Sequence, residues 1–131
     1  MSQEEPGPIP GGKLEYAVLA AVWELGSASA REIYDRVGVP LGLVYTTTSR
    51  VLDRLQAKGL VSRDKTGKGF VYQARVARRE VDRARLSHAL SHVLGEQPRP
   101  ALASLVDAIE AIDPGLVDEL ARAVEARRRS R

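Results

Sequence analysis

The sequence predicts a mainly α-helical protein that contains one small β-hairpin. Three observations support this fold class. Apolar residues recur with the 3.6-residue period of a helix in several segments, among them residues 14–25 and 44–55. Glycine and proline separate these segments, and the stretch after Leu60 alternates instead between apolar and polar residues, as strands do. Taken in order, the elements predict a winged helix-turn-helix followed by a helical tail.

Length and composition limit the possible classes of protein. The 131 residues suffice for one domain with a hydrophobic core plus an appendage. Cysteine is absent, which excludes disulfides, thiolate metal sites and cysteine nucleophiles. The sequence shows neither a basic, apolar leader nor an apolar run long enough to span a bilayer. We therefore expect a cytoplasmic protein without membrane insertion, associated with the nucleoid if it binds DNA.

Composition and charge divide the chain into four parts. Residues 1–12 are rich in proline and glycine and predict a disordered leader. Residues 13–75 hold ten basic against six acidic residues, whereas residues 76–126 hold six against nine, and residues 127–131 form a basic tail. A basic front part fits a polyanion-binding module joined to a module with another task, although chance scatter of the charges remains an alternative.

The first two predicted helices precede a turn rich in helix breakers. One helix spans residues 13–25, and Trp23 lies off its apolar stripe, so we expect a second buried side there. A short extended link follows. Ser29 and Glu32 then have the spacing of a capping box, which predicts a helix start at Ala30. Residues 38–42 (GVPLG) contain too many breakers to be helical and predict the turn of a helix-turn-helix.

Residues 44–60 predict an amphipathic helix with two differently used faces. Gly59 ends it, and Leu60 can fold back on Leu55 as in a Schellman motif. A core is expected to cover the apolar stripe formed by Val44, Thr48, Val51, Leu52 and Leu55. The opposite face carries short hydroxyls followed by a guanidinium, near the positive end of the helix dipole. This combination suits a DNA major groove flanked by phosphates.

Five residues on this polar face are candidate DNA contacts. Arg50 can bridge O6 and N7 of a guanine, while Thr46, Thr47 and Ser49 can donate to phosphates or contact a thymine edge. Tyr45 can donate its hydroxyl to a phosphate or can cover the core beside the groove. The alternative for the set is a solvated helix face.

The predicted hairpin supplies two further candidates. Residues 61–64 and 70–73 alternate as strands, and the segment 65–69 between them is basic and rich in glycine. Directly after a helix-turn-helix, such a hairpin predicts a wing, on which Lys65 and Lys68 would lie along phosphates. A solvated loop is the alternative.

The tail predicts three helices over residues 77–94, 101–112 and from Asp113 onward. Asp113 is an N-cap residue and Pro114 occupies the first helical position. Short helices with apolar stripes that cannot cover one another favour pairing with the same segment of a second chain. The predicted dimer interface consists of Leu86, Leu90, Leu102, Leu105, Ile109, Val117, Leu120 and Val124.

The central run resembles the recognition helix of the penicillinase-repressor family. The resemblance is carried by residues 43–55 (LVYTTTSRVLDRL) with 58–61 (KGLV), and residues 14–16 and 22–23 resemble the family's first helix. The family comprises winged-helix repressors of β-lactamase and methicillin-resistance genes, with copper-responsive relatives. The resemblance implies a homodimer that binds inverted-repeat operators through a dimerising tail.

The chain departs from the family pattern in three places. Thr48 stands where the family usually has an apolar residue. In antibiotic-responsive members a membrane sensor protease leads to cleavage of an Asn-Phe bond in the tail, and Ala108-Ile109 occupies that position here. Such a protease is the partner that the resemblance implies, although its bond is missing. The cysteine-rich C-terminus of the copper-responsive relatives has no counterpart.

The remaining features point away from catalysis. No nucleophile, base and orienting residue share a useful spacing, so we expect no enzyme and no cofactor. His88 and His92 lie four apart on one helix but have no third ligand, so no metal site is predicted. Arg54 is interpreted as a surface partner of neighbouring charges. The sequence thus predicts a sequence-specific repressor, with a winged-helix protein-interaction module as the alternative.

Overall fold

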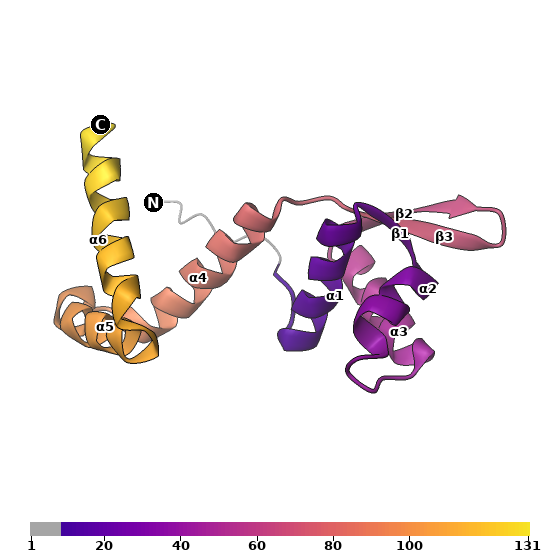
Figure 1. The fold of residues 1–131 in the computed structure, drawn as a ribbon, viewed down its shortest axis with the longest axis horizontal. Coiled ribbons are helices and arrows are strands. Elements are labelled where there is room, and N and C mark those ends of the chain that lie inside the picture. Colours follow the sequence, from indigo (N-terminus) through magenta and orange to yellow (C-terminus); the bar gives the residue numbers. More distant parts are fainter. Residues whose placement is uncertain (1–8) are drawn as a thin grey trace. The chain divides into compact units, whose positions relative to one another are not determined.

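The structure is a computed structural model that describes residues 9–131 (Figure 1). The described elements are α1 (Lys13–Leu25), β1 (Ser27–Ser29), α2 (Ala30–Ile33), the π-helical turn η1 (Tyr34–Gly38), α3 (Tyr45–Ala57), β2 (Val61–Thr66), β3 (Gly69–Ala74), α4 (Arg78–Leu94), α5 (Pro98–Ile112) and α6 (Pro114–Arg129). The mainly helical class with a small antiparallel sheet is confirmed. The chain divides into two compact units after His88.

The sheet has three strands rather than the two of a hairpin. β3 lies between β1 and β2, and both pairings are antiparallel. The sequence predicted only an extended link at Ser27 and Ala28. In the structure this link pairs with β3, with Ala28 opposite Tyr72, and both side chains are almost fully buried. Pairing satisfies an edge of β3 that would otherwise present free backbone donors and acceptors.

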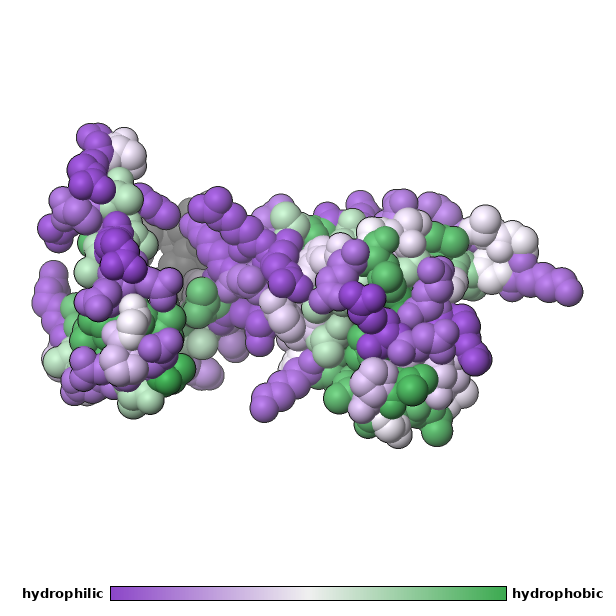
Figure 2. Space-filling model, in the orientation of Figure 1, coloured by the Kyte–Doolittle hydropathy of each residue, from purple (hydrophilic) through white to green (hydrophobic). Residues whose placement is uncertain are grey.

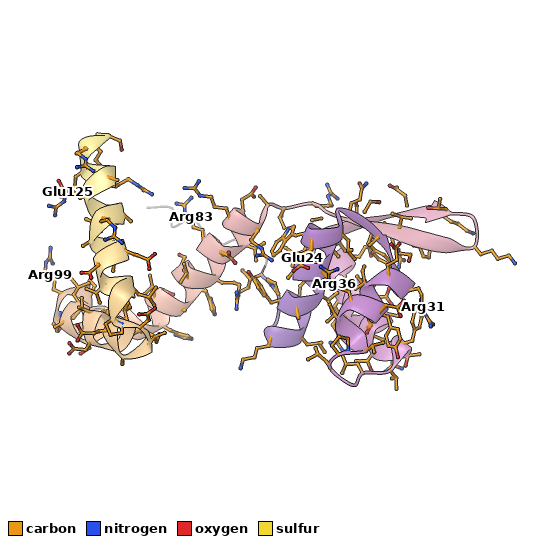
Figure 3. All side chains as sticks on the ribbon, in the orientation of Figure 1. Glu24, Arg31, Arg36, Arg83, Arg99 and Glu125 are labelled. Atoms are coloured by element: carbon orange, nitrogen blue, oxygen red, sulfur yellow. The ribbon has the colours of Figure 1, made fainter. Side chains whose placement is uncertain are left out.

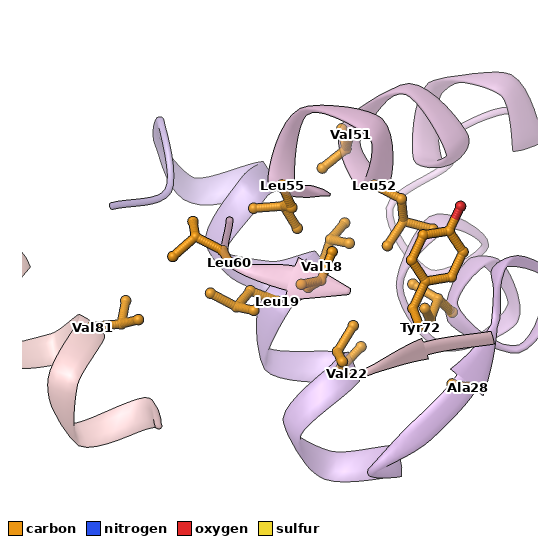
Figure 4. Packing of buried hydrophobic residues seen from close by; sticks show 13 residues of the cluster. Val18, Leu19, Val22, Ala28, Val51, Leu52, Leu55, Leu60, Tyr72 and Val81 are labelled. Atoms are coloured by element: carbon orange, nitrogen blue, oxygen red, sulfur yellow. The ribbon is translucent and has the colours of Figure 1, made fainter. Parts of the chain in front are cut away.

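The core of the first unit lies between α1, α3 and the sheet. The apolar stripe of α3 packs on that of α1, with Leu52 and Leu55 facing Val18 and Leu19 (Figure 4). The prediction that Val44 belongs to the buried stripe of α3 is wrong, because Val44 is 62% exposed. It precedes α3 as the N-cap residue with extended backbone, so its side chain leaves the helical stripe.

Helix α3 ends as its sequence predicts. The Leu60 amide donates to the Leu55 carbonyl at 2.9 Å, and the Gly59 amide donates to Gln56 at 3.0 Å. Gly59 has φ of +78°, the left-handed conformation that this cap requires. Leu55 and Leu60 are both fully buried. The Schellman motif therefore anchors the end of α3 in the core.

The turn before α3 depends on a close approach at Gly38. The predicted capping box starts α2, with reciprocal hydrogen bonds between Ser29 and Glu32. Four residues later the helix widens into η1. A Cβ atom on Gly38 would lie 2.5 Å from the ring of Tyr34 and 2.7 Å from Oγ1 of Thr48. Thr48 is fully buried, so only glycine fits between these two side chains.

A partly buried ion pair joins the beginning of α1 to the end of α3. Lys58 Nζ lies 2.6 Å from Oε1 of Glu15, which is 8% exposed and also accepts from the Gly11 amide at 2.9 Å. Lys58 donates as well to the carbonyl of Ile9 at 3.4 Å. Residues 9–12, assigned to a disordered leader from composition, therefore lie against the first unit, while residues 1–8 fall outside the described residues.

Replacing Glu15 with glutamine should lower the free energy of unfolding by about 1–2 kcal/mol near neutral pH. Burial alone raises the pKa of Glu15, but hydrogen bonds from Lys58 and Gly11 and the positive charges of Lys58 and Arg54 outweigh it and hold the pKa below its ordinary value. The stabilisation by ionised Glu15 is therefore present above the pKa that Glu15 has in the unfolded chain. It is lost as the pH falls through the pKa that Glu15 has in the folded protein. Denaturant unfolding at neutral pH and at about pH 3 tests this linkage. A wild-type advantage that does not shrink in acid would contradict it.

The start of α4 packs on α1 within the first unit. Trp23 donates through Nε1 to the Val76 carbonyl at 2.9 Å, and its ring contacts Tyr16 edge to face. The Tyr16 hydroxyl donates to Asp82 at 2.7 Å, which raises the pKa of Tyr16. Val81 is 2% exposed. The second buried side of α1 that Trp23 predicted is therefore occupied by α4.

The second unit consists of the end of α4 with α5 and α6. Asp113 caps α6 by accepting from the Gly115 amide at 2.9 Å, as predicted. α5 begins at Pro98, before its expected start, and α6 continues to Arg129. Several apolar residues remain exposed here: Val93, Leu102, Val106, Ile112, Leu120 and Val124. No helix in the described residues is long and apolar enough to cross a membrane.

Candidate nucleic-acid interface

The outward face of α3 carries the polar candidates. Thr46 and Arg50 are exposed, while Thr47 and Ser49 are half-buried. Within residues 9–131 these four side chains take part in no hydrogen bond or ion pair. Thr48, between them, points into the core, where its hydroxyl has no partner in the described residues. The side chains that can meet a ligand are thus separated from those that pack.

Tyr45 lies at the start of α3 and packs on a residue of η1. Its ring packs edge to face on Tyr34 with the centroids 5.5 Å apart, and the guanidinium of Arg31 lies 5.6 Å from the Tyr34 ring. The residue is nevertheless 40% exposed. The ring therefore helps to fix the start of α3, while the hydroxyl stays available to an external acceptor.

The wing is longer, and its turn tighter, than the sequence predicted. The last strand pair is Thr66 with Gly69, so the turn consists of Gly67 and Lys68 alone, and Gly67 has φ of +60°. Lys65 lies within β2 opposite Phe70. Lys65 and Lys68 are both exposed. The two lysines therefore occupy the end of a regular hairpin, not a loop of five residues.

A cluster that the sequence analysis missed joins α3 to the wing. Arg63 Nη1 on β2 lies 3.0 Å from Oδ1 of Asp53 on α3. The same guanidinium lies 4.5 Å from the centroid of the Phe70 ring on β3. Asp53 would otherwise present an unpaired negative charge on the face that carries Arg50. The Asp53–Arg63 spacing in sequence contains no periodic signal that could reveal this pair.

Arg54 differs from its expected role. The two charged residues near it in sequence form ion pairs with other elements: Asp53 pairs with Arg63, and Lys58 pairs with Glu15. In the described part of the chain Arg54 has no ion-pair partner, and it is exposed one turn after Arg50. The expected pairing with a neighbouring charge is absent from the described residues, and the charge of Arg54 acts instead on Glu15 of α1, whose pKa it helps to lower.

Two arginines that precede α3 form ion pairs with carboxylates. Arg36 on η1 lies 2.6 Å from Glu24 on α1, and Figure 3 labels both side chains. Arg31 on α2 lies 3.5 Å from Asp35. These exposed pairs add little stability. They do reduce the net positive charge of α2 and η1, so the unpaired cations of the helix-turn-helix concentrate on α3.

Comparison with known sequences identifies the family. The family profile described as penicillinase repressor matches residues 11–126. The chain belongs to the penicillinase repressor family.

Two proteins illustrate the range of similarity within and around this family. An uncharacterized 16.5 kDa protein in the ptsI 3′ region of Latilactobacillus sakei is 28% identical over 93 residues, which cover 71% of this chain and 64% of that protein. This chain therefore matches less than two thirds of its relative's length. The solved DNA-binding domain of the repressor BlaI is 24% identical, with a TM-score of 0.50, and covers 56% of this chain and 92% of the domain. The latter likeness confirms the winged-helix fold.

The Ala108-Ile109 bond, which the resemblance aligned with the family's cleavage bond, lies on α5. Ala108 is exposed and Ile109 is half-buried in the middle of this helix. The chain belongs to the penicillinase repressor family but has no Asn-Phe pair at this position. Backbone within a regular helix is also a poor protease substrate, because cleavage needs an extended segment.

The predicted interface residues lie on both sides of the boundary between the units. Leu86, on α4 in the first unit, is 61% exposed. In the second unit, exposed or half-buried positions are taken by Leu90, Leu102, Leu105, Ile109, Val117, Leu120 and Val124. None of these residues is fully buried within the chain. All of them therefore retain apolar surface that another molecule can cover.

The two histidines lie one turn apart on α4. His88 and His92 are both exposed. Across residues 9–131, no group of three or more histidine, aspartate or glutamate side chains is arranged to hold a metal ion. Two imidazoles alone make a weak site, so the structure offers no reason to assign metal binding to this pair.

Proposed function

We propose that this member of the penicillinase repressor family is a sequence-specific DNA-binding repressor. One observation carries the proposal: Thr46, Thr47, Ser49 and Arg50 form a face of α3 without internal partners in the described residues. These polar groups contribute nothing to the packing of α3, and they lie together on the face that points away from the core. A major groove offers acceptors for all of them, with the guanidinium fitting O6 and N7 of guanine.

Repression would require a dimer. The apolar residues of the second unit favour pairing with the same segment of a second copy, because the exposed stripe recurs on both α5 and α6. Two-fold symmetry then places two copies of α3 in major grooves about one helical turn, ~34–36 Å, apart. The operator would be an inverted repeat, and the dimer bound at a promoter would exclude polymerase sterically.

Footprinting on DNA upstream of the gene and its neighbours tests the proposal at a fixed, near-physiological salt concentration. A protected inverted repeat with half-sites about one turn apart supports it. Sedimentation of the free protein measures whether the dimer forms before DNA is bound. Protection spread evenly over the DNA and abolished by modest salt would refute sequence-specific repression, since only non-specific attraction behaves in that way.

The Lys65→Glu/Lys68→Glu variant tests the role of the wing. We expect weaker DNA binding and a plot of log affinity against log salt that is shallower by about two, since each phosphate contact contributes ~0.9 to the slope. Lys13→Glu, an exposed position at the start of α1, is the matched control and should leave the slope nearly unchanged. An unaltered slope in the wing variant would remove both lysines from the interface.

The contacts weaken one part of the alternative, a protein-interaction module. That alternative required the Tyr45 and Trp23 side or the tail to receive a partner. The Trp23 ring is covered by its bond to Val76 and by the Arg78 guanidinium at 5.1 Å, whereas Tyr45 and apolar residues of the tail stay exposed.

A further inference from the structure

The turn before α3 exposes apolar side chains where a solvated turn would carry polar ones. Residues 38–44 (GVPLGLV) include no charged or hydrogen-bonding side chain. Val39 is 55% exposed, Leu41 57% and Val44 62%. In Figure 2, hydrophobic side chains reach the surface at the lower end of the unit that holds α3, where Figure 1 places this turn. Apolar surface concentrated at one site commonly marks a contact with another molecule.

The turn is held in a defined conformation. Three backbone hydrogen bonds close it: Leu41 to Val37 at 3.3 Å, Gly42 to Val39 at 3.0 Å and Leu43 to Gly38 at 2.8 Å, amide to carbonyl in each case. Gly42 has φ of +70°, which places the bend without strain. The exposed side chains therefore project from a rigid support, so that contact with a ligand requires little loss of conformational freedom.

The location of the turn indicates what it contacts. Val44 directly precedes α3 as its N-cap residue, next to Tyr45 and Thr46. In a helix-turn-helix, the N-terminal residues of the recognition helix reach the base edges. The major groove presents a single kind of apolar group there, the C5-methyl group of thymine. The side chains of the turn offer no donor to a phosphate, so their apolar surface matches the thymine methyl group rather than the sugar-phosphate backbone.

We propose that Leu41 and Val44 contact thymine methyl groups, so that each half-site contains thymines beside the guanine read by Arg50. This inference rests on the proposed DNA-binding function and deepens it. The hydroxyls and Arg50 would read polar base edges, and the turn would read the one apolar feature of the groove. A second copy of the chain or a protein partner covering the same residues would leave binding indifferent to thymine methyl groups.

Deoxyuridine substitution tests this contact directly. Uracil pairs with adenine as thymine does and lacks only the C5-methyl group. The full-length protein is titrated with the footprinted operator and with duplexes in which single half-site thymines are replaced by deoxyuridine. For at least one position we expect about fourfold weaker binding, the effect of losing one buried methyl group. Thymines between the half-sites serve as matched controls and should show no change.

The Leu41→Ala/Val44→Ala variant assigns the effect to the turn. Both side chains are exposed, so the variant should fold normally, as thermal unfolding would verify. It should bind thymine and deoxyuridine operators equally. An operator that wild-type protein protects but that is insensitive to deoxyuridine overturns the methyl contact and leaves the proposed function intact. The contact is likewise overturned if the variant retains the full deoxyuridine effect. Failure of wild-type protein to protect any sequence overturns the proposed function itself.

Discussion

Replacing Arg50 with alanine should weaken binding to the operator by about 5- to 150-fold, equivalent to ~1–3 kcal/mol. The guanidinium is exposed on α3 and has no ion-pair partner in the described residues, so its removal costs the fold little. Its expected contribution to operator affinity comes from two parallel hydrogen bonds to one guanine. Titration of the footprinted operator measures the loss, and thermal unfolding should show an unchanged midpoint.

Arg50→Lys is the matched variant for this result. Lysine keeps the positive charge but cannot form the planar, bidentate contact. If Arg50 reads a base, the lysine variant should lose most of the affinity that alanine loses, and discrimination against changes at the contacted guanine should relax. If instead lysine restores wild-type affinity, Arg50 contacts phosphate and the specificity assigned to it is wrong.

Replacing Gly38 with alanine should lower the free energy of unfolding by about 1–3 kcal/mol or more, the usual cost of overpacking. The added Cβ would lie 2.5 Å from Tyr34 and 2.7 Å from Thr48 Oγ1, both closer than non-bonded atoms approach. Thr48 is fully buried and Tyr34 packs on Tyr45, so neither side chain can move freely. Relief of the clash would shift the turn against α3, and DNA affinity should fall with stability.

Two further variants control the Gly38 experiment. At Gly69 an added Cβ meets nothing within 4 Å, so Gly69→Ala should change stability little. Combining Gly38→Ala with Thr48→Ala removes one of the two clashing atoms and should recover part of the loss. Urea unfolding provides the comparison. Equal stability of Gly38→Ala and Gly69→Ala would mean that the two helices adjust without strain.

Local signals explain why several elements could be predicted from sequence. The capping box of Ser29 and Glu32, the Schellman glycine at position 59 and the Asp113 cap each depend on residues at most five apart. The helices of the first unit follow from apolar periodicity, and the wing follows from alternation around a glycine. The polar face of α3 was predictable for the same reason, because helical geometry alone separates it from the buried stripe.

The errors arose where contacts join residues distant in sequence. β1 was interpreted as a link because a three-residue strand has no periodicity, and its partner Tyr72 lies 44 residues after Ala28. Arg54 was assigned to a surface pair because its neighbours' actual partners, Arg63 and Glu15, belong to other elements. The Val44 error was local instead, because the residue was placed on a buried stripe although the helix begins one residue after it.

The order of elements, the caps that bound them and the family to which the chain belongs could all be inferred from the sequence, because they depend on local propensity and on residue identity. Tertiary packing was needed to establish which charges remain unpaired, which glycine is irreplaceable and which apolar residues of the turn stay exposed. Pairing and exposure depend on the whole packed core: Asp53 on α3 is neutralised by Arg63 from the wing, and Gly38 cannot be replaced because side chains from two elements, Tyr34 and Thr48, lie close to it.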